Sequence, residues 1–100
     1  MLTHLVLARW KPGTTPDQIA AIKAKAPVLL GIEGVESVEL HANLGLAQPA
    51  FGRGIQSILI VRMRDRATLD RYGPHPLHAE LGAVLMPNVD ELTITDYEAD

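Results

Sequence analysis

The chain has 100 residues, a length that predicts a single domain over residues 1–100 with a modest core, to which pairing with another subunit would add stability. Its net charge of −3 argues against a nucleic-acid-binding protein. The absence of cysteine excludes disulfides, thiol nucleophiles and zinc–thiolate sites. The apolar stretch at residues 2–10 is too short to cross a membrane and lacks the basic start of a signal peptide, so we expect a cytoplasmic protein.

The first elements expected are a strand and a helix. Residues 2–10 are rich in Leu and Val, which predicts a strand. Thr15, followed by Pro16 and then by Gln18 three residues after Thr15, is typical of a capping box at a helix start. Apolar residues then recur at helical spacing, and Pro27 is expected to kink or shorten the last turns.

A second strand and a long loop follow. Residues 35–42 alternate charged residues with valine, which predicts a strand less buried than the first. Residues 43–54 have no period and contain three glycines and a proline, so we expect a loop. Because its glycines supply conformational freedom, this loop is a candidate lid, with Phe51 as the large apolar residue that closes over a pocket.

The remaining pattern completes a recognised order of elements. Residues 55–64 predict a strand, residues 66–72 a short helix, residues 76–86 its continuation, and residues 89–97 a last strand. The order is βαββαβ, which predicts an α+β domain of the ferredoxin-like type, with a four-stranded antiparallel sheet and its helices on one face.

The first and third predicted strands carry apolar residues toward both faces of the sheet. A sheet with helices on one face and water on the other would alternate strictly. We therefore expect a second subunit to cover the free face, giving a homodimer in which two sheets face each other. The residues concerned are Leu5, Leu7, Ile58 and Ile60 on one face and Val6, Ala8, Leu59 and Val61 on the other.

The heptapeptide Tyr72-Gly73-Pro74-His75-Pro76-Leu77-His78 brings a phenol and two imidazoles to a helix start. Pro76 suits the first helical position, so the preceding His75 is expected to be extended and to act as the N-cap. His78 then lies in the first turn, where the helix dipole favours a neutral imidazole that can accept a proton.

Two interpretations of this motif are open. In the first, His78 is a general base or acid, and the Tyr72 hydroxyl polarises the carbonyl group whose α-proton is removed. In the second, both residues are structural: Tyr72 caps the break between two helices, and His78 bonds to a backbone carbonyl.

The alternation of side chains along the strands predicts two further residues for the candidate site. His4 is expected on the same face as Val6, and Ser57 on the same face as Leu59. If that face meets the helices, His4 and Ser57 converge with Tyr72 and His78 on one pocket; the alternative is a core histidine with satisfied hydrogen bonds. We also place His75 and Phe51 among the residues that contact a substrate.

A metal is not expected. His75 and His78 have the three-residue spacing of a metal-binding pair, but no carboxylate occupies a matching position, and Glu80 points elsewhere on the helix. No glycine-rich phosphate motif is present, so we predict neither metal nor cofactor.

The chain resembles the stress-responsive A/B barrel domain (Dabb) family over nearly its whole length. The resemblance rests mainly on Tyr72-x-x-His75-Pro76-x-His78, together with the opening strand, the Gly34-Val35 pair and the closing Asp96-Tyr97. It implies a ferredoxin-like protomer whose dimer forms a barrel with the helices outside. Most members of the family have no assigned activity.

One branch of that family is a plant polyketide (olivetolic acid) cyclase, which forms an aromatic carboxylic acid by intramolecular aldol condensation. The resemblance implies that its proton-handling tyrosine and histidine correspond to Tyr72 and His78, and its first-strand histidine to His4. Its third-strand histidine falls on Ser57, so this chain departs from the cyclase and the substrate does not carry over. Dimeric barrels of the same architecture include small cofactor-free monooxygenases and lactone isomerases, an analogy of fold alone.

The sequence thus predicts a small dimeric A/B barrel protein with a hydrophobic pocket in each subunit. The function that the sequence favours is that of a cofactor-independent cyclase, lyase or isomerase, which would use Tyr72 and His78 on an enolisable carbonyl compound. The ligand expected is a small hydrophobic, phenolic or keto-acid molecule, with no nucleic acid or membrane as partner. The alternative is a stress-related or ligand-binding protein without catalysis.

Overall fold

The computed structural model describes residues 1–99 as one four-stranded antiparallel sheet with helices, in the strand order β2-β3-β1-β4. The predicted ferredoxin-like α+β fold is confirmed. In residues 1–99 no helix is both long enough and apolar enough to span a membrane. The elements are β1 (Leu2–Trp10), α1 (Pro16–Lys25), the 3-10 helix η1 (Ala26–Gly31), β2 (Val35–Ala42), α2 (Pro49–Gly52), β3 (Ser57–Met63), α3 (Arg66–Tyr72), α4 (Pro76–Leu85), the 3-10 helix η2 (Met86–Asn88) and β4 (Val89–Glu98).

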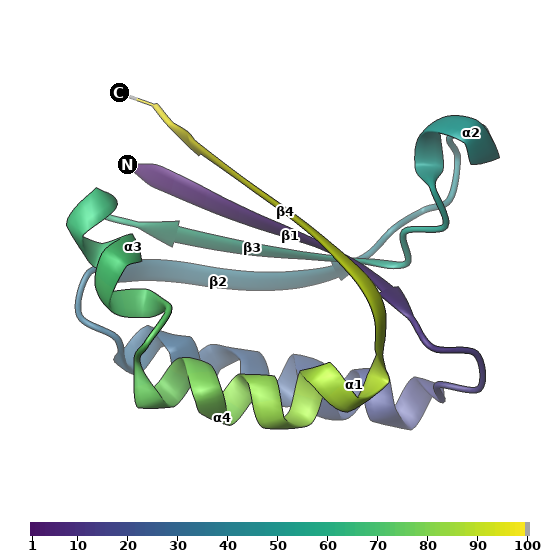
Figure 1. Ribbon diagram of the computed structural model, residues 1–100, viewed down its shortest axis with the longest axis horizontal. Helices are drawn as coiled ribbons and strands as arrows, with labels where there is room; N and C mark the ends of the chain where they lie inside the picture. Colours follow the sequence, from purple (N-terminus) through teal and green to yellow (C-terminus); the bar gives the residue numbers. More distant parts are fainter. Residues whose placement is uncertain (100) are drawn as a thin grey trace.

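The molecule has two layers. Helices α1 and α4 lie side by side under one face of the sheet, while the opposite face carries no helix (Figure 1). Strand β4 is an edge strand that pairs only with β1 in the described chain. The segment with α2 projects beyond one end of the sheet (Figure 1).

Side-chain hydrogen bonds fix the start of α1, and a proline limits its length. The Thr15 hydroxyl accepts a hydrogen bond from the Gln18 backbone N–H, and the Gln18 side chain accepts one from the Thr15 N–H, so the expected capping box is confirmed. The α-helix stops at Lys25, and Pro27 lies in the 3-10 turn that follows. Pro27 therefore shortens α1, because proline removes a backbone donor and clashes with the preceding turn.

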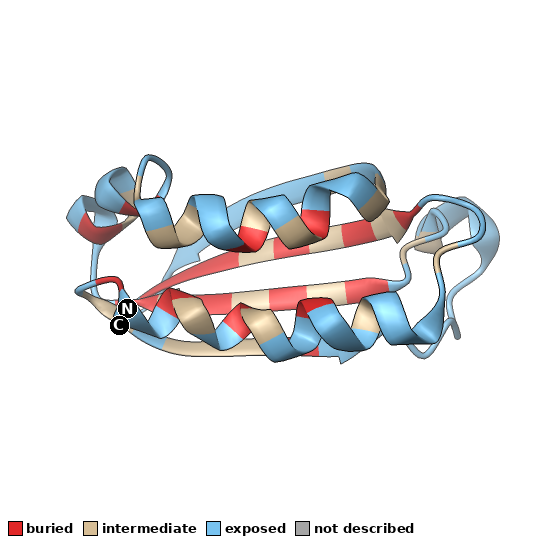
Figure 2. Ribbon diagram, turned by 90° about the horizontal axis from the view of Figure 1, so that it is seen from below, coloured by how far each residue is buried: buried red, intermediate tan, exposed pale blue. Residues whose placement is uncertain are grey.

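Burial alternates along the two central strands. On the face toward the helices Val6, Leu59 and Val61 are buried, and Figure 2 shows this alternation along the strands. We call the opposite, helix-free side the outer face. Its apolar residues are only half-buried within one chain; they are Leu5, Leu7, Ile58 and Ile60. No described part of the chain covers them fully, as the sequence pattern predicted.

The predicted loop at residues 43–54 contains the four-residue helix α2. Its base is tied together by two hydrogen bonds, from the Asn43 side-chain amide to the Ile55 carbonyl at 2.8 Å and from the Asn43 N–H to the Gln56 carbonyl at 2.9 Å. The segment has little apolar contact of its own, because Leu44, Leu46 and Phe51 are all more than three-quarters exposed.

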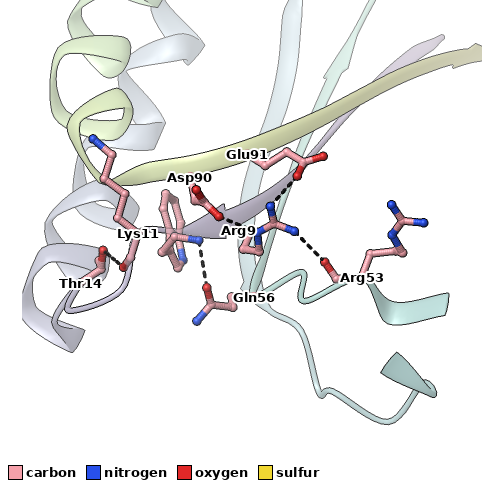
Figure 3. A network of polar contacts seen from close by, with 8 residues as sticks. Arg9, Lys11, Thr14, Arg53, Gln56, Asp90 and Glu91 are labelled. Atoms are coloured by element: carbon pink, nitrogen blue, oxygen red, sulfur yellow. Dashed lines mark hydrogen bonds and ion pairs between the residues drawn. The ribbon is translucent and has the colours of Figure 1, made fainter. Parts of the chain in front are cut away.

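Arg9 joins three segments at this end of the sheet (Figure 3). Its guanidinium donates to Asp90 at 2.8 Å and to Glu91 at 2.5 Å, both on β4. It also donates to the Arg53 carbonyl at 3.4 Å, just after α2. These bonds connect β1, β4 and the α2 segment on the surface, where each ion pair contributes little to stability but fixes orientation.

Candidate active site

A cavity of about 150 Å³ lies between α4 and the β1–β4 side of the sheet. Its polar side chains are His4 from β1, Tyr72 from the end of α3 and His78 from the first turn of α4. The rest of its wall is mainly apolar and includes Val6, Leu59, Leu81, Leu85, Leu92 and Ile94. A small group of hydrogen-bonding side chains in an apolar pocket is typical of a site that orients a small ligand.

Tyr72 is the centre of a cluster of three rings. Its ring centroid lies 4.7 Å from that of His78 and 5.2 Å from that of His4, with interplanar angles of 59° and 63°. Tyr72 itself is only 3% exposed. Tilted and edge-on contacts at these distances are favourable for aromatic rings, so packing holds the three side chains on one wall of the cavity.

Local capping places Tyr72 and His78. The Asp65 carboxylate accepts hydrogen bonds from both the backbone N–H and the hydroxyl of Thr68, which fixes the start of α3. Tyr72 ends that helix, and α4 starts after His75, whose Nδ1 accepts the Leu77 N–H at 3.0 Å. The break between the two short helices turns both the phenol and the His78 imidazole toward the sheet.

The phenol of Tyr72 is held in its protonated form. Burial, and secondly the negative charge of Asp96, raise the pKa of Tyr72 to about 12. Both effects disfavour the phenolate. At neutral pH the Tyr72 hydroxyl is therefore a hydrogen-bond donor on the cavity wall.

His78 is shifted in the direction of a neutral base. Burial lowers the pKa of His78 below its ordinary value, His4 lowers it further when it carries a positive charge, and the hydrogen bond to the Gly73 backbone acts in the opposite direction. The direction agrees with the sequence argument, although burial, rather than the helix dipole, is the main cause. A neutral imidazole keeps one ring nitrogen free to accept a proton.

Asp96 is a further residue of the site, and nothing in the sequence beyond the family resemblance points to it. It lies opposite His4 in the β1–β4 pairing, and its Oδ1 is 2.5 Å from Nδ1 of His4. A carboxylate bonded to Nδ1 favours the tautomer that carries its proton there, and so leaves Nε2 as the acceptor. No local signal in the sequence marks this role, because Asp96 is one of four acidic residues in β4, with Asp90, Glu91 and Glu98.

The structure brings His4, Tyr72 and His78 together but not the other three predicted contact residues. Ser57 does share the helix-facing side of the sheet, yet it pairs with Ala8, four residues or roughly 13 Å along β1 from His4, and its hydroxyl accepts the Trp10 indole N–H at 3.0 Å. His75 caps α4, and Phe51 is 78% exposed. None of the three lines the cavity in this structure, and their contact with a substrate stays a prediction.

The arrangement combines a protonated phenol and a neutral imidazole in one apolar cavity. Such a pair can donate a hydrogen bond to one atom of a ligand and accept a proton from a neighbouring atom. Among residues 1–99, no three His, Asp or Glu side chains are grouped as ligands for a metal ion.

The antiparallel sheet, its two helices on one face and the Tyr72–His78 pair define a ferredoxin-like protein with a cavity between sheet and helix. The chain belongs to the stress-responsive A/B barrel domain family, Dabb, whose family model matches residues 2–99. No curated protein sequence matches the chain.

Solved structures of the same fold cover almost the whole chain. One from Arabidopsis thaliana has a TM-score of 0.87 and 20% identity, with 100% of this chain and 96% of that chain covered. The hydroxynitrile lyase from Passiflora edulis has a TM-score of 0.83 and 19% identity, with 99% and 93% covered. A Dabb family protein with a ferredoxin-like fold from Mesorhizobium loti has a TM-score of 0.78 and 20% identity, with 98% and 95% covered.

Proposed function

We propose that this protein is a cofactor-independent acid–base catalyst, a cyclase, lyase or isomerase, that acts on an enolisable carbonyl compound. One observation carries the proposal. The rings of Tyr72 and His78 lie 4.7 Å apart on the wall of an apolar cavity that is large enough for a ligand. The protonation states favoured by burial, phenol and neutral imidazole, are those that enolisation requires.

In the proposed reaction His78 removes the proton from the carbon next to the carbonyl group. The electron pair of that C–H bond forms the enolate, whose negative oxygen accepts the Tyr72 hydrogen bond. The imidazolium then returns the proton. In isomerisation the proton goes to a different carbon. In cyclisation the enolate carbon forms a bond to a second carbonyl carbon, and the alkoxide that results takes the proton. In a lyase reaction the enolate expels a leaving group, which takes the proton.

The similar structures support this class of chemistry without naming a substrate. One of them is a hydroxynitrile lyase, so a lyase exists on a closely similar backbone. At 19% identity the likeness extends to the fold alone. The plant polyketide cyclase has a histidine where this chain has Ser57, and Ser57 lies outside the cavity, which argues against that cyclase's own substrate.

We propose further that the protein is a homodimer joined through its outer face, forming a dimeric α/β barrel. The half-buried apolar side chains on that face, with Leu5 and Ile58 on its two central strands, support this arrangement. Structural neighbours from Thermobifida fusca, Bacteroides fragilis and Jannaschia are described as dimeric. Covering this face removes apolar surface from water in both subunits.

Deuterium exchange tests the proposed catalysis before a natural substrate is known. Acetophenone and 4-phenylbutan-2-one are incubated with the protein in D₂O, and loss of the α-proton signal is followed by NMR. We expect exchange above the buffer rate, lowered about 100-fold or more in Tyr72→Phe and in His78→Ala, because each removes one group of the pair. Lys23→Ala, which removes an exposed side chain of α1 outside the cavity and away from the outer face, is the control and should exchange like the wild type.

The second candidate function is that of a non-catalytic ligand-binding protein. It is favoured by the mainly apolar wall of the cavity, which alone suffices for binding a hydrophobic molecule. Saturable binding of these ketones, with exchange at the buffer rate in wild type and variants alike, would support it over the enzyme.

A further inference from the structure

We propose that the cavity selects an uncharged carbonyl compound whose apolar part is about as large as one six-membered ring, and that Gly82 determines this size limit. The inference rests on the proposed function, because it assumes that the carbonyl group is bound by Tyr72. Beyond the proposed function, the inference names the class of ligand and the residue that limits the size of that ligand.

The volume of the cavity limits what fits. At about 150 Å³, it is close to the volume of the engineered apolar cavity that binds benzene. Its buried apolar wall, formed by residues such as Leu59, Leu81 and Leu85, suits a ring or a compact branched chain. Met86 and Ile94, both about half exposed, lie where the cavity meets solvent.

Gly82 is unusual because helix packing does not require it. It lies inside α4 with negative φ, in a position where alanine would favour the helix. A Cβ atom added at Gly82 would meet no heavy atom within 4 Å, whereas one at Gly31 would lie 2.6 Å from Leu77 Cδ1. Gly82 also lines the cavity. The missing side chain therefore leaves free volume on the helix side of the cavity.

Charge excludes an anionic ligand from the same cavity. No Lys or Arg is among the residues that line it, and the carboxylate of Asp96 acts on Tyr72 as a negative charge. A carboxylate that entered would lose its water, and no Lys or Arg of the cavity wall would pair with it. Of the ligands expected from the sequence, this favours a neutral carbonyl compound over a keto acid.

Binding measurements with three probes test the ligand class. Acetophenone is neutral with one ring, benzoate is an anion of similar size, and 2-acetylnaphthalene has two fused rings. Each is titrated into ¹⁵N-labelled protein, and saturable shifts of the amides around Leu81 and Leu85 are followed by NMR. We expect acetophenone to bind, and benzoate and 2-acetylnaphthalene to bind at least about tenfold more weakly.

Three variants test the role of Gly82. Gly82→Leu fills the free volume and should weaken acetophenone binding by about tenfold or more. Ala83→Leu places the same side chain at the next, exposed position of α4 and should bind like the wild type. Gly82→Ala should raise the thermal midpoint, because alanine favours the helix, while weakening binding less than leucine does. The alanine variant keeps the test valid if the leucine variant fails to fold.

The outcomes separate this inference from the proposed function. Equal binding of acetophenone by Gly82→Leu and Ala83→Leu, preferential binding of benzoate, or no saturable binding of acetophenone up to its solubility would overturn the inference. Exchange that persists unchanged in Tyr72→Phe and His78→Ala would overturn the proposed catalysis, while the selectivity measured by binding would stand.

Discussion

His4 and Asp96 face each other across the β1–β4 pair, and Nδ1 of His4 lies 2.5 Å from Oδ1 of Asp96. His4 is 8% exposed, and its ring packs against Tyr72 at the cavity wall. Asp96 is thus linked to Tyr72 and His78 without lining the cavity itself. Its effect on a ligand must pass through His4 or through its charge, which makes it a positioning residue.

Asp96→Asn should lower α-proton exchange by roughly tenfold to 100-fold, because the amide no longer selects the His4 tautomer with its proton on Nδ1. The NMR signals of the His4 ring nitrogens should report the change of tautomer. Asp90→Asn is the matched control, since Asp90 lies on the same strand but bonds to Arg9 away from the cavity. An Asp96 variant with normal exchange and an altered His4 tautomer would show that this contact does not serve catalysis.

His75→Ala should destabilise the protein by about 1 kcal/mol, because the Leu77 N–H loses its acceptor at the start of α4. Thermal or denaturant unfolding measures the loss, and Thr15→Ala, which removes the cap of α1, provides a comparison of similar size. Exchange of acetophenone by the folded variant should be close to that of the wild type. A loss of exchange as large as that of His78→Ala would instead assign His75 to the site.

Leu5→Asp and Ile58→Asp should each dissociate the dimer, because a carboxylate buried between two sheets costs several kcal/mol. Light scattering at micromolar concentration measures the mass, which for one chain is 10.9 kDa. Ala24→Asp adds the same charge on the exposed side of α1 and should remain dimeric. A wild-type protein that is folded and monomeric would contradict the sheet-to-sheet arrangement.

Local signals were enough to predict the elements of the fold. The capping box at Thr15, the helix start at Pro76 and the apolar pattern of residues 2–10 all act within a few residues, and each is found in the structure. Helix α2 was missed because four residues with proline and glycine have no helical period. The break between α3 and α4 was predicted as well, because Pro76 marks a new helix start after the short helix that ends at Tyr72.

The candidate site could be predicted only in part, because strand alternation does not give the register between neighbouring strands. Alternation placed His4 and Ser57 on the same face, but only the register between β1 and β3 separates them along the sheet. The same kind of pairing, between β1 and β4, brings Asp96 to His4. Phe51 was selected for its size, whereas the course of the α2 segment beyond the sheet decides that its side chain is exposed.

The pH dependence of α-proton exchange tests the central claim most directly. The pKa of His78 is lowered, so its imidazole loses its proton at a pH below the ordinary histidine pKa of about 6.5. At neutral pH it is therefore a neutral base. We predict that the wild-type exchange rate with acetophenone is half-maximal below about pH 6.5 and then stays level through pH 9, because the pKa of Tyr72 is raised to about 12. A midpoint above 6.5, a fall between pH 7 and 9, or the same acid limb in His78→Ala would contradict proton transfer by this pair.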